Sequence, residues 1–336
     1  MSAGERAIAK EMRREEKERK KRIREANKML IPVSKKTEES LNLVSFDPSG
    51  AFFFYDERWM KCYKGEGDLC KLVDAAKSLE GRIRITLHMG DGSDRVTCHL
   101  SLMETGEIYE EVRVKISADE AELRKAVSIT PLSVDEVMNE IIANNLKDIR
   151  FSYPSYVRGN KDWKKECISE CLVEDVGFKM QGMYGAALQI LSYPAHPVEA
   201  VIEQLKSLGI SMYISLDLNA LTDEEAADFK RAIEKKYNRR LPVAVEEHYQ
   251  NFSTSIVIFG DSRDAVNIVT ETICSMLMNQ GFLVVPAFHN QNVVTESALS
   301  YGLLDCKAMR NVDTEVIKAV LGGVDDADAK IEIRAD

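Results

Sequence analysis

Several segments of this 336-residue chain place apolar side chains at every second position, which is the spacing of a strand buried on one face. Residues 82–89 and 95–103 show it most clearly, and the sequence between them is rich in Gly and Asp, as hairpin turns are. We predict one buried and one solvated face for this hairpin. Aromatic runs at 51–55 and 59–63 predict an earlier hairpin, whose faces are either buried under a helix or partly offered to a partner.

Three further segments have the apolar period of a helix, namely residues 68–79, 118–126 and 133–144. The last begins with Ser133 and has Glu136 three positions later. This pair is typical of a capping box, in which each side chain binds the backbone amide of the other residue. The order of strands and helices predicts a first α+β domain over residues 31–150.

Residues 151–165 have no sustained period and contain Pro154 and Gly159, so we predict a linker there. Strands then alternate with helices through residue 305, with predicted strands at 172–180, 185–192, 210–218, 254–259 and 282–285. This alternation predicts a second α+β domain over residues 166–305. A short helix and an acidic tail are expected over 306–336.

The predicted fold class is therefore α+β. We expect two domains with mixed or antiparallel sheets and helices packed on one face, as in ferredoxin-like sandwiches, preceded by a charged N-terminal helix.

Residues 1–30 form a charged arm that we predict to be a solvated helix or disordered. Residues 5–28 carry eleven Lys or Arg and six Glu, whereas the whole chain has 45 basic and 55 acidic residues and a net charge of −10. An acidic body disfavours non-specific binding to nucleic acid or anionic lipid. The arm is thus the segment predicted to contact an anionic surface, if any does.

The seven cysteines include no Cys-x-x-Cys pair, and their odd number argues against a disulfide framework and for a reducing compartment. The charged N-terminus does not resemble a signal peptide, and no window approaches the roughly 18 apolar residues of a membrane span. We expect a cytoplasmic protein, with peripheral contact at the cytoplasmic face of the membrane through the arm as an open alternative.

Gly260 lies between a predicted strand and a predicted helix start, where free backbone amides could hold a phosphate. One glycine is not a nucleotide-binding fingerprint, and Asp261 and Asp264 already place negative charge at that helix start. We interpret the segment as a capped helix start. A nucleotide- or small-molecule-binding enzyme that uses this turn is the alternative function.

His88 and His99 lie on the predicted solvated face of the second hairpin, with Asp91 and Asp94 in its turn. Four such donors could hold a metal, but their spacing does not match a structural zinc site. Asp and Gly are also the ordinary residues of a hairpin turn, so we favour a plain turn.

Cys167 and Cys171 have helical i, i+4 spacing without a nearby histidine pair, and we interpret them as buried free thiols. His248 follows two glutamates but lacks the second histidine of a metalloprotease helix. No Ser or Cys nucleophile has a histidine partner set by its local sequence. We predict no catalytic, cofactor-binding or metal-binding residue, no cofactor, and no enzymatic activity.

Two strings in the second domain, GAALQILSYP at 185–194 and ISMYISLDL at 210–218, resemble the front domain of the conjugative-transfer ATPases of type IV secretion, the TraC, TraE, TrbE and CagE family. The resemblance covers most of residues 31–302. It includes HNQNVVTESALSYG at 289–302, where this chain has Ser300-Tyr301 in place of the family's expected proline. A motor domain follows in the family, but this sequence lacks the Gly-x-x-x-x-Gly-Lys-Ser/Thr loop that binds nucleotide phosphates.

The front domain of that family docks the ATPase to membrane-embedded subunits and to neighbouring copies. The resemblance therefore implies a non-enzymatic scaffold of a conjugation or type IV secretion apparatus that acts with a separate ATPase. The implied partners are that ATPase, inner-membrane subunits and other copies of this chain, with no direct sequence-specific contact to nucleic acid.

Overall fold

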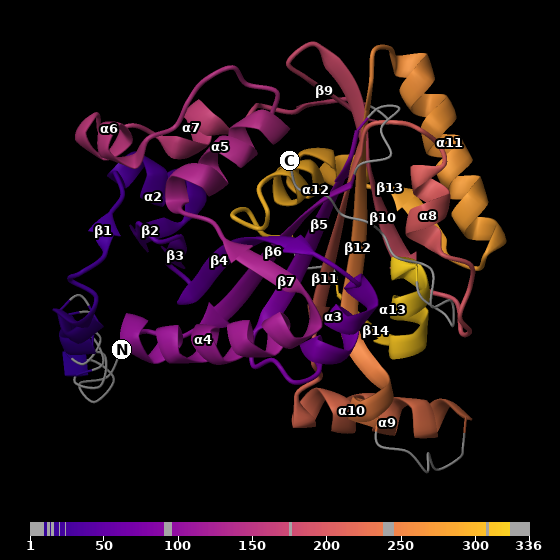
Figure 1. The fold of residues 1–336 in the computed structure, drawn as a ribbon, viewed down its shortest axis with the longest axis horizontal. Coiled ribbons are helices and arrows are strands. Elements are labelled where there is room, and N and C mark those ends of the chain that lie inside the picture. The colour runs from indigo at the N-terminus through magenta and orange to yellow at the C-terminus, as the bar shows by residue number, and fades with distance from the viewer. Residues whose placement is uncertain are drawn as a thin grey trace.

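The computed structural model describes residues 25–90, 96–174, 177–237, 245–306 and 309–322, together with residues 10, 11, 14, 17–19 and 21–23. The fold is α+β, as predicted: antiparallel strands form one large sheet, and helices pack against it (Figure 1).

The described strands are β1 (Ile31–Pro32), β2 (Leu43–Asp47), β3 (Ala51–Phe54), β4 (Arg58–Glu66), β5 (Arg82–Met89), β6 (Val96–Thr105), β7 (Ser128–Pro131), β8 (Leu172–Val173), β9 (Phe178–Met180), β10 (Met183–Ser192), β11 (Met212–Asn219), β12 (Tyr249–Gly260), β13 (Leu283–Pro286) and β14 (Arg310–Asp313). Both predicted hairpins are confirmed, as β3–β4 and β5–β6.

The described helices are α2 (Lys35–Leu41), α3 (Leu69–Ala76), α4 (Tyr109–Ala126), α5 (Val134–Asn144), α6 (Tyr153–Arg158), α7 (Trp163–Cys167), α8 (Val201–Lys206), α9 (Asp223–Tyr237), α10 (Val245–His248), α11 (Arg263–Asn279), α12 (Gln291–Leu299) and α13 (Thr314–Leu321), with a 3₁₀ turn η1 (Phe288–Asn290). The segment predicted as a linker thus carries α6 and the start of α7. The predicted short helix after residue 305 is α13, and the acidic tail lies outside the described residues.

Strands from both predicted domains belong to the same sheet, whose order is β1-β2-β3-β4-β6-β5-β11-β12-β10-β9-β8. The junction is the antiparallel pair β5–β11, which runs from Met89 opposite Met212 to Ile83 opposite Leu218. Two separate sheets would each have left a long apolar edge strand here, and pairing satisfies the backbone groups of both edges. The boundary at 151–165 stays a prediction, but the strands on either side of it share one hydrogen-bonded sheet.

Helices cover both faces of this sheet, and not one face as predicted. Helices α3, α4, α8, α11 and α13 pack on one face, while α5, α7 and α12 pack on the other. The reason is visible in the first hairpin, where Phe53 and Trp59 face one core and Phe52 and Met60 face the other. A strand that is apolar on both sides needs cover on both sides. The aromatic residues of this hairpin are buried, not offered to a partner, except Tyr55 at its turn.

Helix starts follow the sequence signals. Ser133 accepts a bond from the amide of Glu136 at 3.3 Å, and the Glu136 carboxylate accepts from the amide of Ser133 at 2.8 Å, so the predicted capping box is confirmed. Asp68 caps α3 by accepting a bond from the amide of Cys70 at 2.9 Å. None of the described helices could span a bilayer: even α4, with 18 residues, carries charged side chains along its length.

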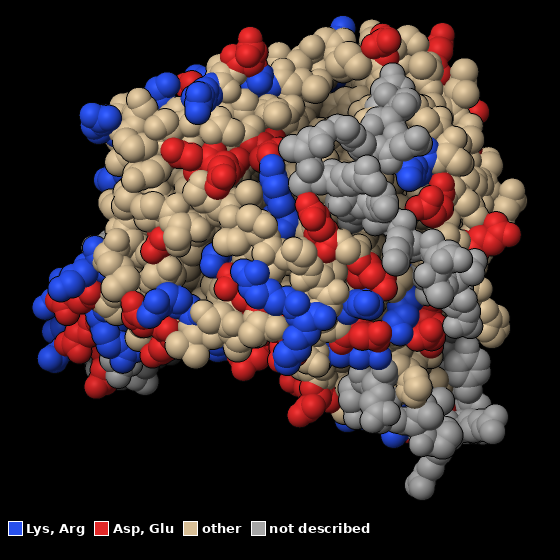
Figure 2. Space-filling view, in the orientation of Figure 1, with Lys and Arg blue, Asp and Glu red and all other residues tan. Residues whose placement is uncertain are grey.

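The N-terminal arm is helical at its described positions between residues 10 and 26. Arg19 in the arm pairs with Glu57 and Glu107, and the Asn27 side chain bonds to Glu107 and to the amide of Tyr109 at the start of α4. Figure 2 shows basic and acidic side chains mixed on this part of the molecule, at the lower left. The arm therefore contacts the body through acidic groups of the body.

Candidate functional site

His88 and His99, which were considered as metal ligands and not favoured, do share one face of the second hairpin, but that face is buried rather than solvated. His88 stacks on Tyr213 with ring centroids 4.2 Å apart, and His99 stacks on Tyr301 at 4.5 Å. Burial lowers the pKa of His99 to about 4, so its ring is neutral at physiological pH. The alternating pattern gave no sign that α12 and the turn after it would cover this face.

Asp91 and Asp94, the two turn residues considered with them, lie outside the described residues. Within the part of the chain that the structure describes, no three His, Cys, Asp or Glu side chains are grouped as a metal site would require.

The Gly260 turn leads from β12 into α11, as predicted. Ser262 is the N-cap and accepts a bond from the amide of Ala265 at 3.2 Å. The serine between Asp261 and Asp264 therefore satisfies one of the free amides at this helix start. Arg263 beside it pairs with Glu174. The small hollow next to this start has a volume of about 130 Å³, too small for a nucleotide.

Cys167 and Cys171 are buried free thiols, as predicted. Burial raises the pKa of each to about 12, which keeps both thiols protonated and weakly nucleophilic. His248 is exposed at the end of α10, and the side chains of the two preceding glutamates lie outside the described part.

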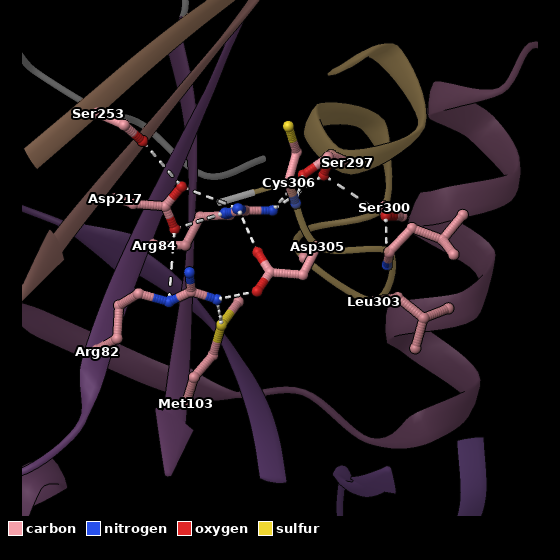
Figure 3. A network of polar contacts seen from close by, with 12 residues as sticks. Arg82, Arg84, Met103, Asp217, Ser253, Ser297, Ser300, Leu303, Asp305 and Cys306 are labelled. Atoms are coloured by element: carbon pink, nitrogen blue, oxygen red, sulfur yellow. Dashed lines mark hydrogen bonds and ion pairs between the residues drawn. The ribbon is translucent and has the colours of Figure 1, made fainter. Parts of the chain in front are cut away.

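A buried ionic network lies where β5, β11 and the turn after α12 meet (Figure 3). Arg84 is 1% exposed and donates to the two carboxylate oxygens of Asp217 at 2.9 and 2.8 Å. It also donates to Asp305 at 3.1 Å and to the hydroxyl of Ser297 at 2.9 Å. Arg82 donates to Asp305 at 2.7 Å. Burial alone would raise the pKa of Asp305, but Arg82 and Arg84 outweigh it and hold that pKa below its usual value.

The sequence did not predict this network. Arg82 and Arg84 alternate with the apolar residues of segment 82–89, and this pattern placed them on the face of the hairpin that was predicted to be solvated. The available signal was Asp217, a carboxylate inside the apolar strand ISMYISLDL, since a charge in a buried strand needs a partner. Nothing in the local sequence could identify that partner, 133 positions away.

The turn after α12 approaches this network closely. Tyr301 and Gly302 have φ angles of 54° and 91°, both in the left-handed region. A Cβ atom on Gly302 would lie 2.2 Å from Cε of Met103 and 3.0 Å from Nη1 of Arg84, so only glycine fits. A proline ring fixes φ near −65° and could not occupy position 301.

Arg58 is a third buried arginine, 9% exposed, with weaker charge compensation. It donates to the carbonyl oxygens of Gly302 at 2.7 Å and Leu303 at 3.4 Å, and its guanidinium lies 3.8 Å from the centre of the Phe54 ring. Among the described residues, its ion-pair partner is Asp56, 3.9 Å away and 61% exposed. Burial lowers the pKa of Arg58, which marks a cation held in an unfavourable environment.

Two hollows open beside Arg58, which lines both. The larger has a volume of about 590 Å³ and is bordered by Arg82, Glu104, Asn251 and Arg310 among others. The second, of about 480 Å³, is bordered by Asp305 and Glu296. Small-molecule sites in proteins commonly have such volumes.

Glu104 faces the larger hollow and is 3% exposed. Burial, together with the adjacent Asp119, raises the pKa of Glu104 to about 8. Asp119 in turn accepts bonds from the amides of Glu80 at 3.3 Å and Gly81 at 3.1 Å. Glu104 is thus protonated at neutral pH, and chemically this part of the site combines arginine cations with an uncharged carboxyl group.

A second feature is a surface formed by residues 264–306, which we call the β13 edge surface. This segment includes most of α11, all of β13 and α12, and the turn after α12. It contains no Lys or Arg. Helix α11 packs on one face of β10 and β12, and α12 packs on the opposite face, so the segment wraps the edge formed by β13. Its exposed apolar side chains are Ile268, Met278, Leu283, Phe288 and Val293. In Figure 2 the area over α11, at the right, is mostly uncharged.

No protein-family model matches this chain, and no curated protein matches it either.

Proposed function

We propose that the protein is a non-enzymatic docking component of a conjugation or type IV secretion apparatus that works beside a separately encoded ATPase. The observation that supports this best is the β13 edge surface, which exposes five large apolar side chains and contains no Lys or Arg. The cores of protein interfaces are depleted of charged residues, because burying an unpaired charge is costly. The resemblance of 185–302 to the front domains of conjugative ATPases supplies the class of partner.

The internal groups are consistent with a scaffold. The cysteines Cys62, Cys98, Cys167 and Cys171 have pKa values raised to about 12 by burial, so none of these four is an activated nucleophile. The Arg84 network binds carbonyl and carboxylate groups of the chain itself. A turn that is held by such contacts presents α12 and η1 as a rigid surface.

The test is co-purification from cells that carry a complete transfer apparatus, with partners identified by mass spectrometry. The wild-type protein should recover an ATPase or an inner-membrane subunit. Ile268→Lys and Phe288→Lys should reduce that recovery, because each puts a cation into the apolar surface. Val114→Lys is the matched control, since Val114 is 67% exposed on α4 and Ile268 is 65% exposed on α11. Repeated recovery of the wild-type protein alone would refute the proposal.

We also propose a peripheral membrane contact through the arm, on the strength of its net positive charge. Co-sedimentation with anionic vesicles should fall when residues 1–29 are deleted, and should weaken at higher salt, because salt screens exposed charges. Equal sedimentation with and without residues 1–29 would show that the arm does not mediate membrane contact.

A further inference from the structure

We propose that the larger hollow beside Arg58 binds a small phosphate ester, with the phosphate held by Arg58, Arg82 and Arg310. This site is separate from the β13 edge surface and from the Gly260 turn, and it does not depend on the docking function.

The first argument is charge. Among the described residues, the guanidinium groups of Arg82 and Arg84 pair with the buried carboxylates of Asp217 and Asp305, whereas Arg58 forms no ion pair with a buried carboxylate. Asp56 is mostly exposed and 3.9 Å from Arg58, so water screens it. The cluster therefore keeps an excess positive charge with little access to water, and an anion in the adjoining hollow would compensate it.

The second argument is hydrogen bonding. Nε of Arg58 is buried and has no hydrogen-bond partner in the described chain. Glu104 borders the same hollow, and its protonated carboxyl group bonds to Asp119, so it adds no negative charge there. Buried polar atoms are nearly always paired, so an unpaired guanidinium nitrogen on a residue that lines a hollow points to a bound group that the chain alone does not supply.

The lining defines the ligand class. Arginine matches phosphate geometry with two parallel donors, and Arg310 carries no ion pair to a described residue, which leaves its charge for a ligand. Asn219 and Asn251, which face each other across β11 and β12, add amide groups. Glu225 also borders the hollow, and its carboxylate accepts from the Asn251 amide at 3.3 Å and from the Thr222 amide at 2.9 Å. These groups suit the hydroxyls of a sugar or polyol. No aromatic residue lies in the described lining, so stacking on a nucleobase is not favoured.

The probes are glucose 6-phosphate, inorganic phosphate, glucose and ATP, titrated calorimetrically into the full chain in a phosphate-free buffer. We expect saturable binding of glucose 6-phosphate, weaker binding of inorganic phosphate, and none of glucose. Tightest binding of ATP would overturn the assignment to a sugar-like phosphate ester. Absence of saturable binding for both phosphate probes would overturn the site itself.

Variants locate the site. Arg310→Gln removes an exposed side chain that bonds to the backbone carbonyl of Met309, and it should weaken glucose 6-phosphate binding about tenfold without changing the melting temperature. Arg58→Lys keeps the charge but loses the planar fork and should weaken binding by a similar factor, about tenfold. Arg263→Gln, at the α11 start, is the control and should bind as the wild type does. Wild-type affinity in Arg310→Gln, or an equal loss in Arg263→Gln, would refute the assignment even if Arg58→Lys fails to fold.

Discussion

At the scale of single residues, the structure depends on one buried ion pair more than on its surface charges. Arg84 donates from Nε and Nη2 to the two carboxylate oxygens of Asp217, and Asp305 and Ser297 are further partners of the guanidinium group. Removing one partner of such a pair leaves a buried charge without compensation.

We therefore expect Arg84→Met to reduce the free energy of unfolding by about 3–5 kcal/mol. Chemical denaturation followed by circular dichroism measures the change. The control is Arg113→Met, which breaks the exposed pair with Glu110, whose two side chains are 60% and 49% exposed. That change should cost less than about 1 kcal/mol. Equal shifts in the two variants would contradict a special role for the buried pair.

A second residue-scale prediction concerns Glu104. The pKa of Glu104 is about 8 in the folded protein, whereas its ordinary value is 4.5. Between pH 4.5 and pH 8, Glu104 is therefore protonated in the folded state and ionised in the unfolded chain. The contribution of Glu104 to stability is therefore present below pH 4.5 and is lost as pH rises to about 8. Glu104→Gln should remove this loss, so the variant should gain stability relative to the wild type as pH rises.

Urea denaturation midpoints between pH 5 and pH 9 in a phosphate-free buffer test this. Glu110→Gln is the control, because the side chain of Glu110 is 49% exposed on α4, and it should keep the pH slope of the wild type. Parallel curves for the wild type and Glu104→Gln would show that Glu104 does not titrate as described.

At the scale of secondary-structure elements, α5 and α6 both have a serine at the N-cap position, but only one of these two serines makes a capping hydrogen bond. Ser133 caps α5 through its side chain, whereas Ser152 occupies the N-cap position of α6 without a side-chain cap bond. Ser133→Ala should lower the free energy of unfolding by about 1 kcal/mol, because it leaves a helix amide unsatisfied. Ser152→Ala should change it little. Thermal and chemical unfolding of the two variants decide the point, and an equal cost would contradict the capping assignment.

Element prediction succeeded where the determining interactions are local. The capping box of α5, the four buried residues of α3 and both hairpins depend on residues a few positions apart, so the sequence contains their full signal. The Arg84 network and the covered face of His99 could not be predicted, because Asp217, Tyr301 and Asp305 reach them from distant parts of the chain. The hollow beside Arg58 is hidden from the sequence for the same reason.

At the scale of the whole molecule, we predict that the β5–β11 junction couples the unfolding of the two predicted domains. Seven residue pairs join these strands, and apolar residues from both sides of position 151 share one core. Two separate domains would unfold independently, but strands that share a ladder and a core should separate only when the whole sheet does.

Ile273 and the two tryptophans allow this to be measured. Ile273 is fully buried on α11, and Ile273→Ala should cost about 2–5 kcal/mol. Trp59 and Trp163 both precede residue 166, so their fluorescence reports the first predicted domain and the linker. In a cooperative molecule the fluorescence transition of Ile273→Ala shifts together with the circular dichroism transition. If the fluorescence transition stayed at its wild-type midpoint, the two regions would unfold separately and the shared sheet would not couple them.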